Sequence, residues 1–252
     1  MTIHTTSHNR YLLILAILFA VEWLALAIKP YDRHAWLLEN ALVFVLVAII
    51  ALTYKRIPLS RISMTLIFLF LCLHEVGTHY TYAKVPYNVW TQEVFGKSLN
   101  IILGWERNNF DRFVHFSYGL LLAYPVREVF LRIAYVRGFW GYFFPLDITI
   151  STSMIFELFE WAAAEIFGGD LGIAYLGTQG DAWDAHKDVL LASIGAAIAM
   201  IITIGINIHL ENDFAREWAD SLKVKKHRPL GEDEMKRLWR KRNKNNISAG
   251  LK

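Results

Sequence analysis

The stretch "ISMTLIFLFLCLHEVGTHYTY", Ile62 to Tyr82, decides the fold because it begins as an apolar run and ends among polar residues. A helix needs about 20 mostly apolar residues to cross roughly 30 Å of hydrocarbon. This stretch is long enough, yet it carries His74, Glu75 and His79 in its second half. Charged side chains inside a membrane are costly and commonly mark function. The stretch therefore predicts a transmembrane helix that contributes to a polar site.

The composition of the whole chain agrees with a membrane protein. Of the 252 residues, 55% are hydrophobic and 14% aromatic, and the mean hydropathy is +0.31. The apolar runs have the length of helices rather than of alternating strands, which predicts an all-α polytopic bundle. We expect six transmembrane helices at Tyr11–Ile28, Trp36–Thr53, Ile62–Tyr82, Phe113–Leu131, Asp147–Phe167 and Val189–Leu210. The segment between the third and fourth helices, Ala83 to Phe110, has the pattern of an amphipathic stretch lying at the membrane interface.

Lysine and arginine predict the orientation, because cytoplasmic connections carry an excess of both. The second connection holds Lys55, Arg56 and Arg61, and the fourth holds Arg132 and Arg137. The fifth connection, "GGDLGIAYLGTQGDAWDAHKD", is acidic. We therefore expect the basic connections and both termini in the cytoplasm, and the acidic connection on the opposite side.

The chain divides into a six-helix transmembrane domain, residues 1–210, and a basic cytoplasmic tail, residues 211–252. The tail has 12 Lys and Arg against 7 Asp and Glu, a net charge of +5. Such a cluster suits anionic lipid head groups, or it serves only as the charge block that stops translocation. We expect the lipid bilayer as the main partner and no nucleic acid.

The predicted helices place their polar residues at one depth, near the extracytoplasmic side. Residues three or four positions apart share one face of a helix. Four helices each carry such a pair: Glu75 with His79, Asp111 with His115, Glu157 with Glu160, and Asp184 with Asp188. This pattern predicts a polar pocket that opens to the outside.

Imidazoles and carboxylates that converge from several helices suit a divalent metal ion such as zinc. A bound metal lowers the pKa of a water molecule and permits hydrolysis. We assign the metal to His79, His115, Glu160 and Asp188, and catalysis to Glu75, Arg112, Glu157 and Asp184. Without a metal, the same groups would act as general acid and base, as a proton relay, or as structural ion pairs.

The leading functional hypothesis is a hydrolase or transferase that faces the extracytoplasmic side and acts on a lipid-linked or envelope substrate. A small transporter or proton-coupled permease is the first alternative, and a membrane scaffold or assembly factor is the second. The inner half of the bundle offers few polar residues, and no inverted repeat is obvious, which both count against a transporter.

Three segments, "NNFDRFVHF", "ELFEWAAAE" and "GTQGDAWDAHKDVLLASIGA", resemble the YjdF-like family of bacterial inner-membrane proteins. The resemblance extends from about Glu22 to Leu210 and leaves the basic tail outside. It implies a multi-pass protein of the bacterial inner membrane. The family has no established activity, so the resemblance supports the architecture and the location of the site.

The chain is also similar, more distantly, to VanZ-like membrane proteins, which are associated with teicoplanin resistance. Those proteins carry an Asp-Lys-x-x-His-Phe segment, a Glu-x-x-Gln segment and an Asp-x-x-x-Asn-x-x-Gly segment. The matching positions are Asp111, His115, Phe116, Glu157, Asp188 and Gly195, and the departures are Arg112 for Lys, Glu160 for Gln and Ala192 for Asn.

Overall fold

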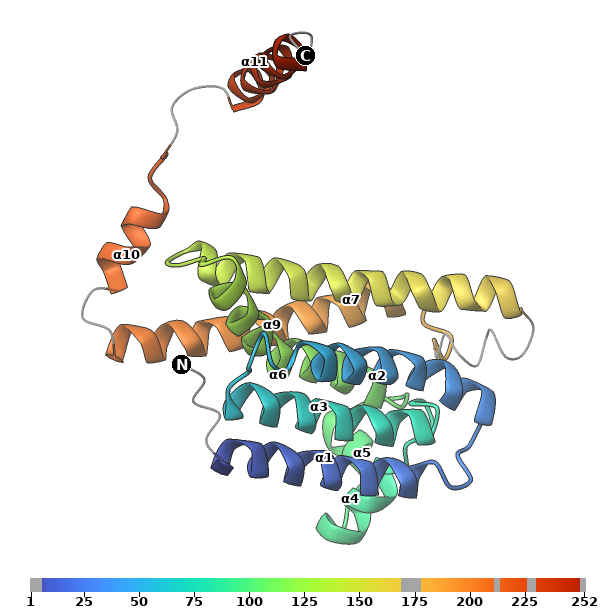
Figure 1. Cartoon of the computed structure of the whole chain (residues 1–252). Coiled ribbons are helices and arrows are strands. Elements are labelled where there is room, and N and C mark those ends of the chain that lie inside the picture. The colour runs from blue at the N-terminus through green and yellow to red at the C-terminus, as the bar shows by residue number, and fades with distance from the viewer. Residues whose placement is uncertain (1–5, 169–177, 211–213, 226–229, 250–252) are drawn as a thin grey trace.

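A computed structural model describes residues 6–168, 178–210, 214–225 and 230–249 (Figure 1). Every regular element in these residues is a helix, which confirms the all-α prediction. The helices are α1 (Thr6–Leu26), α2 (Arg33–Thr53), α3 (Arg61–His79), α4 (Tyr87–Phe95), α5 (Leu99–Leu103), α6 (Phe110–Ile133), α7 (Trp140–Phe167), α9 (Asp184–Leu210), α10 (Phe214–Ser221) and α11 (Leu230–Ala249).

The six long helices lie side by side and alternate in direction (Figure 1). At one end, the backbone N–H of Tyr31, just before α2, donates to the carbonyl of His79 at the end of α3, at 2.8 Å. At the other end, the Tyr54 hydroxyl after α2 donates to Asn9 in α1, at 2.5 Å. We call the end where α2, α6 and α9 begin the site end, and the opposite end the basic end.

Capping residues set the starts of two helices. The Asp32 carboxylate accepts hydrogen bonds from the backbone N–H groups of His34 and Ala35, at 2.7 and 3.0 Å, and so caps α2. The Ser60 hydroxyl accepts from the N–H of Ser63, at 3.2 Å, and caps α3. Both caps lie in the connections that the sequence predicts between apolar runs.

Four of the described helices, α1, α2, α3 and α9, are long and apolar enough to cross a membrane. The fourth and fifth predicted spans lie within α6 and α7, which have 24 and 28 residues. These two helices carry several charged residues, among them Asp111, Glu157 and Glu160. Length and composition therefore support four membrane spans, and the count of six spans stays a prediction.

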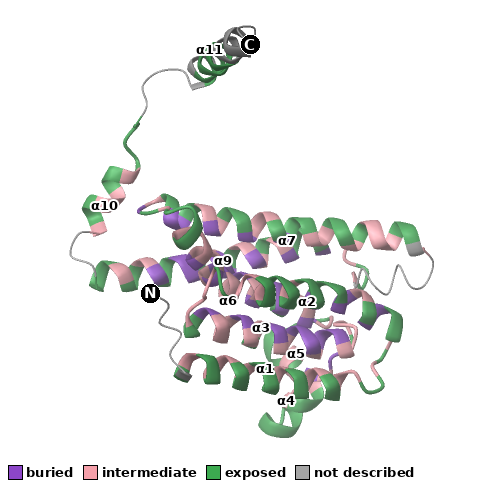
Figure 2. Cartoon of the chain, in the orientation of Figure 1, coloured by how far each residue is buried: buried purple, intermediate pink, exposed green. Residues whose placement is uncertain are grey.

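The tightest packing in the bundle is between α6 and α9. Gly119 of α6 lies against the backbone of Ala192, and Gly195 of α9 lies against the backbone of Phe116. Small residues at such positions let helices approach closely in a membrane. Figure 2 shows the buried residues gathered on these central helices, while α1 exposes most of its surface.

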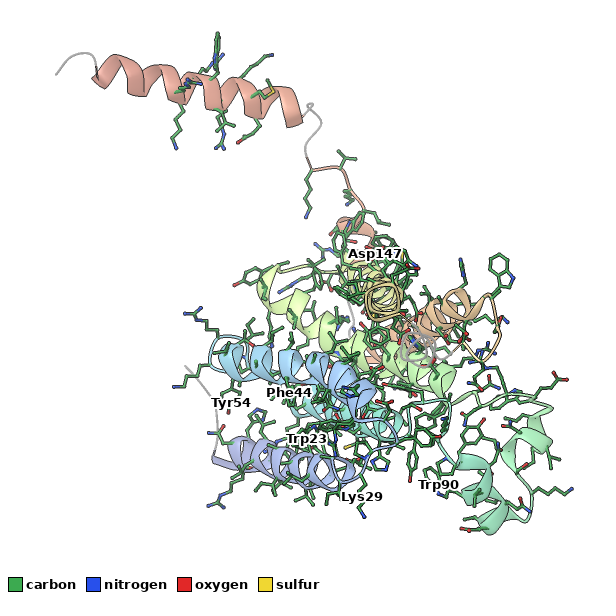
Figure 3. All side chains as sticks on the ribbon, turned by 90° about the vertical axis from the view of Figure 1, so that its right-hand side faces the viewer. Trp23, Lys29, Phe44, Tyr54, Trp90 and Asp147 are labelled. Atoms are coloured by element: carbon green, nitrogen blue, oxygen red, sulfur yellow. The ribbon has the colours of Figure 1, made fainter. Side chains whose placement is uncertain are left out.

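The segment α4–α5 projects from the side of the bundle, as the position of Trp90 in Figure 3 shows. Its exposed large apolar residues are Val89, Trp90, Val94, Phe95, Ile101, Ile102, Leu103 and Trp105. The Tyr87 hydroxyl accepts from the backbone N–H of Asn109 at 2.9 Å and donates to Asn100 at 2.7 Å. These bonds attach the segment to the start of α6, and its place at the membrane interface stays a prediction.

Candidate functional site

Three potential ligand groups meet between α6 and α9 near the site end. Asp111, His115 and Asp188 each offer one ligand atom, and these atoms all lie within 4.8 Å of one another. Asp111 and His115 are one turn apart on α6, so they share a face, and Asp188 comes from the first turns of α9. His115 and Asp188 are buried, and Asp111 is partly buried. The close packing of the two helices brings these groups together.

Helix α7 adds carboxylates on the other side of His115. The His115 Nε2 atom lies 3.3 Å from Glu157 Oε1 and 3.6 Å from Asp111 Oδ1. The imidazole therefore lies between a carboxylate of α7 and a carboxylate of its own helix. Glu160, one turn beyond Glu157, is close enough for electrostatic interaction with Asp111, Glu157 and Asp188.

Helices α2 and α3 each contribute one buried glutamate to this group of side chains. Glu39 of α2 is buried and interacts electrostatically with Asp111, Glu75 and Glu157. Glu75 of α3 has no exposed surface, and its Oε2 accepts from the Thr78 hydroxyl at 3.3 Å. We call the resulting group the polar cluster, and its members are Glu39, Glu75, Asp111, His115, Glu157, Glu160 and Asp188.

Several buried atoms of the polar cluster have no hydrogen-bond partner among the described residues. These atoms are Glu39 Oε2, Glu75 Oε1, Glu157 Oε1 and Asp188 Oδ1. A buried polar atom without a partner costs about 1–3 kcal/mol, and more when it is charged, so each one calls for a ligand, a proton, water or an ion. The six carboxylates that surround the His115 imidazole are oxygen ligands of the kind that suits a cation.

An ion-pair network closes the site end next to the polar cluster. Arg107 donates to both carboxylate oxygens of Asp184, at 2.6 and 3.2 Å. Arg112 donates to Asp181 at 2.5 Å and to Asp184 at 3.1 Å. Lys187, the backbone N–H of Trp183 and Arg112 hold the pKa of Asp181 well below its usual range. Two predicted catalytic residues, Arg112 and Asp184, are thus partners of each other.

The structure does not bring every predicted site residue to one place. His115 and Asp188 lie within ligand distance of each other, together with Asp111. Glu75, Glu157 and Glu160 belong to the polar cluster, and Arg112 and Asp184 to the adjacent network, as described above.

His79 lies outside this group, because α3 ends there and its last turn meets the connection after α1. The His79 Nδ1 atom is 2.7 Å from the carbonyl oxygen of Leu26. The sequence predicts His79 as a metal ligand, but the residue that lies close to His115 and Asp188 in the structure is Asp111. The one-turn spacing of Asp111 and His115 is the sequence signal that points to Asp111. Arg107 lies in a connection, so no helical periodicity indicates its place in the ion-pair network.

Comparison with known proteins places the chain among predicted membrane proteins. A family model described as "Predicted membrane protein (DUF2238)" matches residues 11–208, which include the whole polar cluster. The chain is similar to the inner membrane protein YjdF of Escherichia coli (strain K12), with 38% identity over 175 residues, which are 69% of this chain and 79% of that protein. No solved structure matches the chain.

These matches confirm the resemblance to YjdF-like proteins and the assignment as a membrane protein, and the matching relative is an inner membrane protein. The identity of 38% extends over most of both chains. The chain therefore belongs to this family of predicted membrane proteins.

Proposed function

We propose that the protein is a metal-dependent hydrolase or transferase of the bacterial inner membrane, acting on a lipid-linked or envelope substrate at the outer face. The observation that carries this proposal is the approach of Asp111, His115 and Asp188 to within 4.8 Å. Two carboxylates and one imidazole suit zinc and other first-row divalent ions. Three protein ligands also leave a coordination position for water or substrate, as catalytic sites do.

The residues around this triad supply what hydrolysis needs. A divalent ion bound there would lower the pKa of a water molecule enough to make it a nucleophile near neutral pH. Glu157 lies beside His115, and its Oε1 has no hydrogen-bond partner among the described residues, so it is placed to accept a proton. Glu39 and Glu160 bring further negative charge, which favours retention of a cation.

The membrane placement belongs to the same proposal. All six long helices cross the membrane, the basic end faces the cytoplasm, and the site end faces outward. Support comes from the alternation of the helices and from Lys55, Arg56 and Arg132, which lie at the basic end. A lipid-linked substrate fits this placement, because the exposed apolar segment α4–α5 is attached to the start of α6, where the polar cluster begins.

Reporter fusions test the orientation. A reporter that is active only outside the cytoplasm is expected to give signal when fused after Gly96, between α4 and α5, and none when fused after Leu222, beyond α10. The expectation follows from the excess of lysine and arginine at the basic end. Signal from the Leu222 fusion alone would reverse the orientation and place the site in the cytoplasm.

Turnover tests the proposed chemistry. Wild-type protein in nanodiscs of bacterial polar lipid, supplied with zinc, is expected to release head groups that mass spectrometry detects, and chelator should stop the release. Glu157→Gln is expected to lower the rate about 10² to 10⁴-fold, the usual contribution of a general base, while bound metal is retained. Glu165→Gln is the matched control, because Glu165 lies on α7 but is exposed.

Equal rates for both glutamine variants would exclude Glu157 as the base. If the wild-type protein binds zinc but releases no head group from these lipids or from added lipid-linked precursors, the assignment as hydrolase or transferase is wrong.

A further inference from the structure

A cavity of about 790 Å³ lies at the basic end, far from the polar cluster. Its walls come from the connection between α6 and α7, the start of α7, and α10 with the residues that follow it. Three cationic side chains line it, those of Arg137, Arg216 and Lys225. Three aromatic rings line it as well, those of Tyr135, Trp140 and Phe144.

Specific contacts hold α10 against this connection and so build the cavity. The Ser221 hydroxyl accepts from the backbone N–H of Phe139 at 3.0 Å, and the Ser221 carbonyl accepts from the indole N–H of Trp140 at 2.9 Å. Trp218 packs edge-on against the Phe139 ring, with ring centroids 5.4 Å apart. Figure 1 shows α10 beside the start of α7. The first helix of the tail is therefore docked on the bundle.

The cations of the cavity have unused hydrogen-bonding capacity. Arg137 and Arg216 make no hydrogen bond among the described residues, and each only approaches a carboxylate, Glu217 and Asp220 respectively, at 4.0 Å. Lys223 donates to Asp220 at 2.6 Å and thereby lowers the pKa of that carboxyl. Because Lys223 offsets the charge of Asp220, three cations on the wall face the single remaining negative charge of Glu217, and the cavity is positive.

The apolar part of the wall continues onto the lipid-facing surface of the bundle. Tyr135 is 81% exposed, and Trp140 and Phe143, in the first turn of α7, are also exposed. Tryptophan and tyrosine beside basic residues are typical of the boundary between membrane and water. A ligand with an anionic head and apolar chains would meet cations in the cavity and aromatic rings along its edge.

We propose that this cavity binds the head group of an anionic phospholipid, with the phosphate between Arg137 and Arg216 and the acyl chains along the start of α7. The docked position of α10 would then depend on the surrounding lipid. This inference is independent of the metal site at the other end of the bundle.

Lipid-dependent thermal stability tests the inference. Phosphatidylglycerol added to the detergent-solubilised full-length protein is expected to raise its melting temperature more than phosphatidylcholine does. Arg137→Gln/Arg216→Gln should weaken phosphatidylglycerol binding about 25-fold, because each basic residue near an anionic surface contributes roughly fivefold. Lys236→Gln/Arg240→Gln removes the same charge from α11, outside the cavity, and should leave binding unchanged.

Three outcomes would overturn the inference. The first is equal stabilisation by the two lipids, and the second is equal loss in the cavity variant and the α11 variant, which would indicate attraction to the tail as a whole. The third is full stabilisation by inorganic phosphate alone, which would make the cavity a site for a free anion.

Discussion

Protein purified without chelator is expected to carry about one equivalent of a divalent metal, and His115→Ala to carry almost none. His115 is one of three groups whose ligand atoms lie within 4.8 Å, so its removal leaves two carboxylates to hold the ion. Mutation of a residue that hydrogen-bonds to a metal ligand lowers metal affinity about 10–100-fold. Loss of a ligand itself should therefore lower metal affinity at least roughly 100-fold. Elemental analysis and zinc titration measure both quantities.

His79→Ala is the matched control for this prediction. His79 is also a histidine near the site end, but its Nδ1 faces the Leu26 carbonyl and not the three ligand groups. The variant should therefore retain the metal. Zinc should also raise the melting temperature of the wild type and of His79→Ala, but not of His115→Ala, and this readout does not depend on activity.

Absence of bound metal from the wild-type protein would contradict the metal site. If the wild-type protein holds no metal and binds no added zinc, the imidazole of His115 is a partner for Asp111 and Glu157 in an ion-pair group. The buried oxygens of Glu39, Glu75 and Asp188 would then need protons, which suits a proton relay and the permease alternative. Loss of metal from His79→Ala alone would contradict the geometry of the site.

The fold could be predicted from the sequence because apolar runs decide where membrane helices form. The largest differences lie at helix starts. Helix α9 begins at Asp184 and not at Val189, since Asp184 and Asp188 lie inside the bundle, where Arg107 and Arg112 pair with Asp184. Hydropathy alone predicts that these two aspartates belong to the connection before the helix. The arginines that stabilise them come from distant parts of the chain, so no local pattern contains them.

The site could be predicted only in part, because helical spacing tells which residues share a face but not which faces meet. Asp111 and His115 share a face of α6 and do meet Asp188. Glu75 and His79 have the same spacing on α3, yet the helix ends at His79 and that ring turns to α1. Which of two equally spaced pairs completes the site depends on helix ends and on helix contacts.

Gly195→Ala is expected to destabilise the bundle strongly, because the added methyl group would meet the backbone of a neighbouring helix. An added Cβ would overlap the carbonyl oxygen of Phe116 and lie 2.8 Å from the backbone nitrogen of Leu120, both on α6. Backbone atoms cannot turn aside as a side chain does, so the two helices must separate. Overpacking costs about 3 kcal/mol at the upper end of its usual range. That corresponds to a melting temperature lower by roughly 6 to 12 °C for a chain of this size.

Gly205→Ala is the control, because it adds the same methyl group to the same helix at a position where no described residue comes within 4 Å of the added Cβ. Its melting temperature should equal or slightly exceed that of the wild type, since alanine favours a helix more than glycine does. Gly119→Ala should behave like Gly195→Ala, because its Cβ would meet Ala192 and lie 2.7 Å from the backbone nitrogen of Ala196.

The same substitution links packing to the metal site. Gly119 follows His115 by four residues on α6, and Gly195 follows Asp188 by seven on α9, so each glycine lies one or two turns from a ligand group. Separation of the helices at Gly195 would move Asp188 away from Asp111 and His115. Zinc affinity should therefore fall together with the melting temperature in Gly195→Ala, and neither should fall in Gly205→Ala. Unchanged zinc affinity in a destabilised Gly195→Ala would mean that the ligand groups are held by the ion-pair network of Arg107 and not by the contact between α6 and α9.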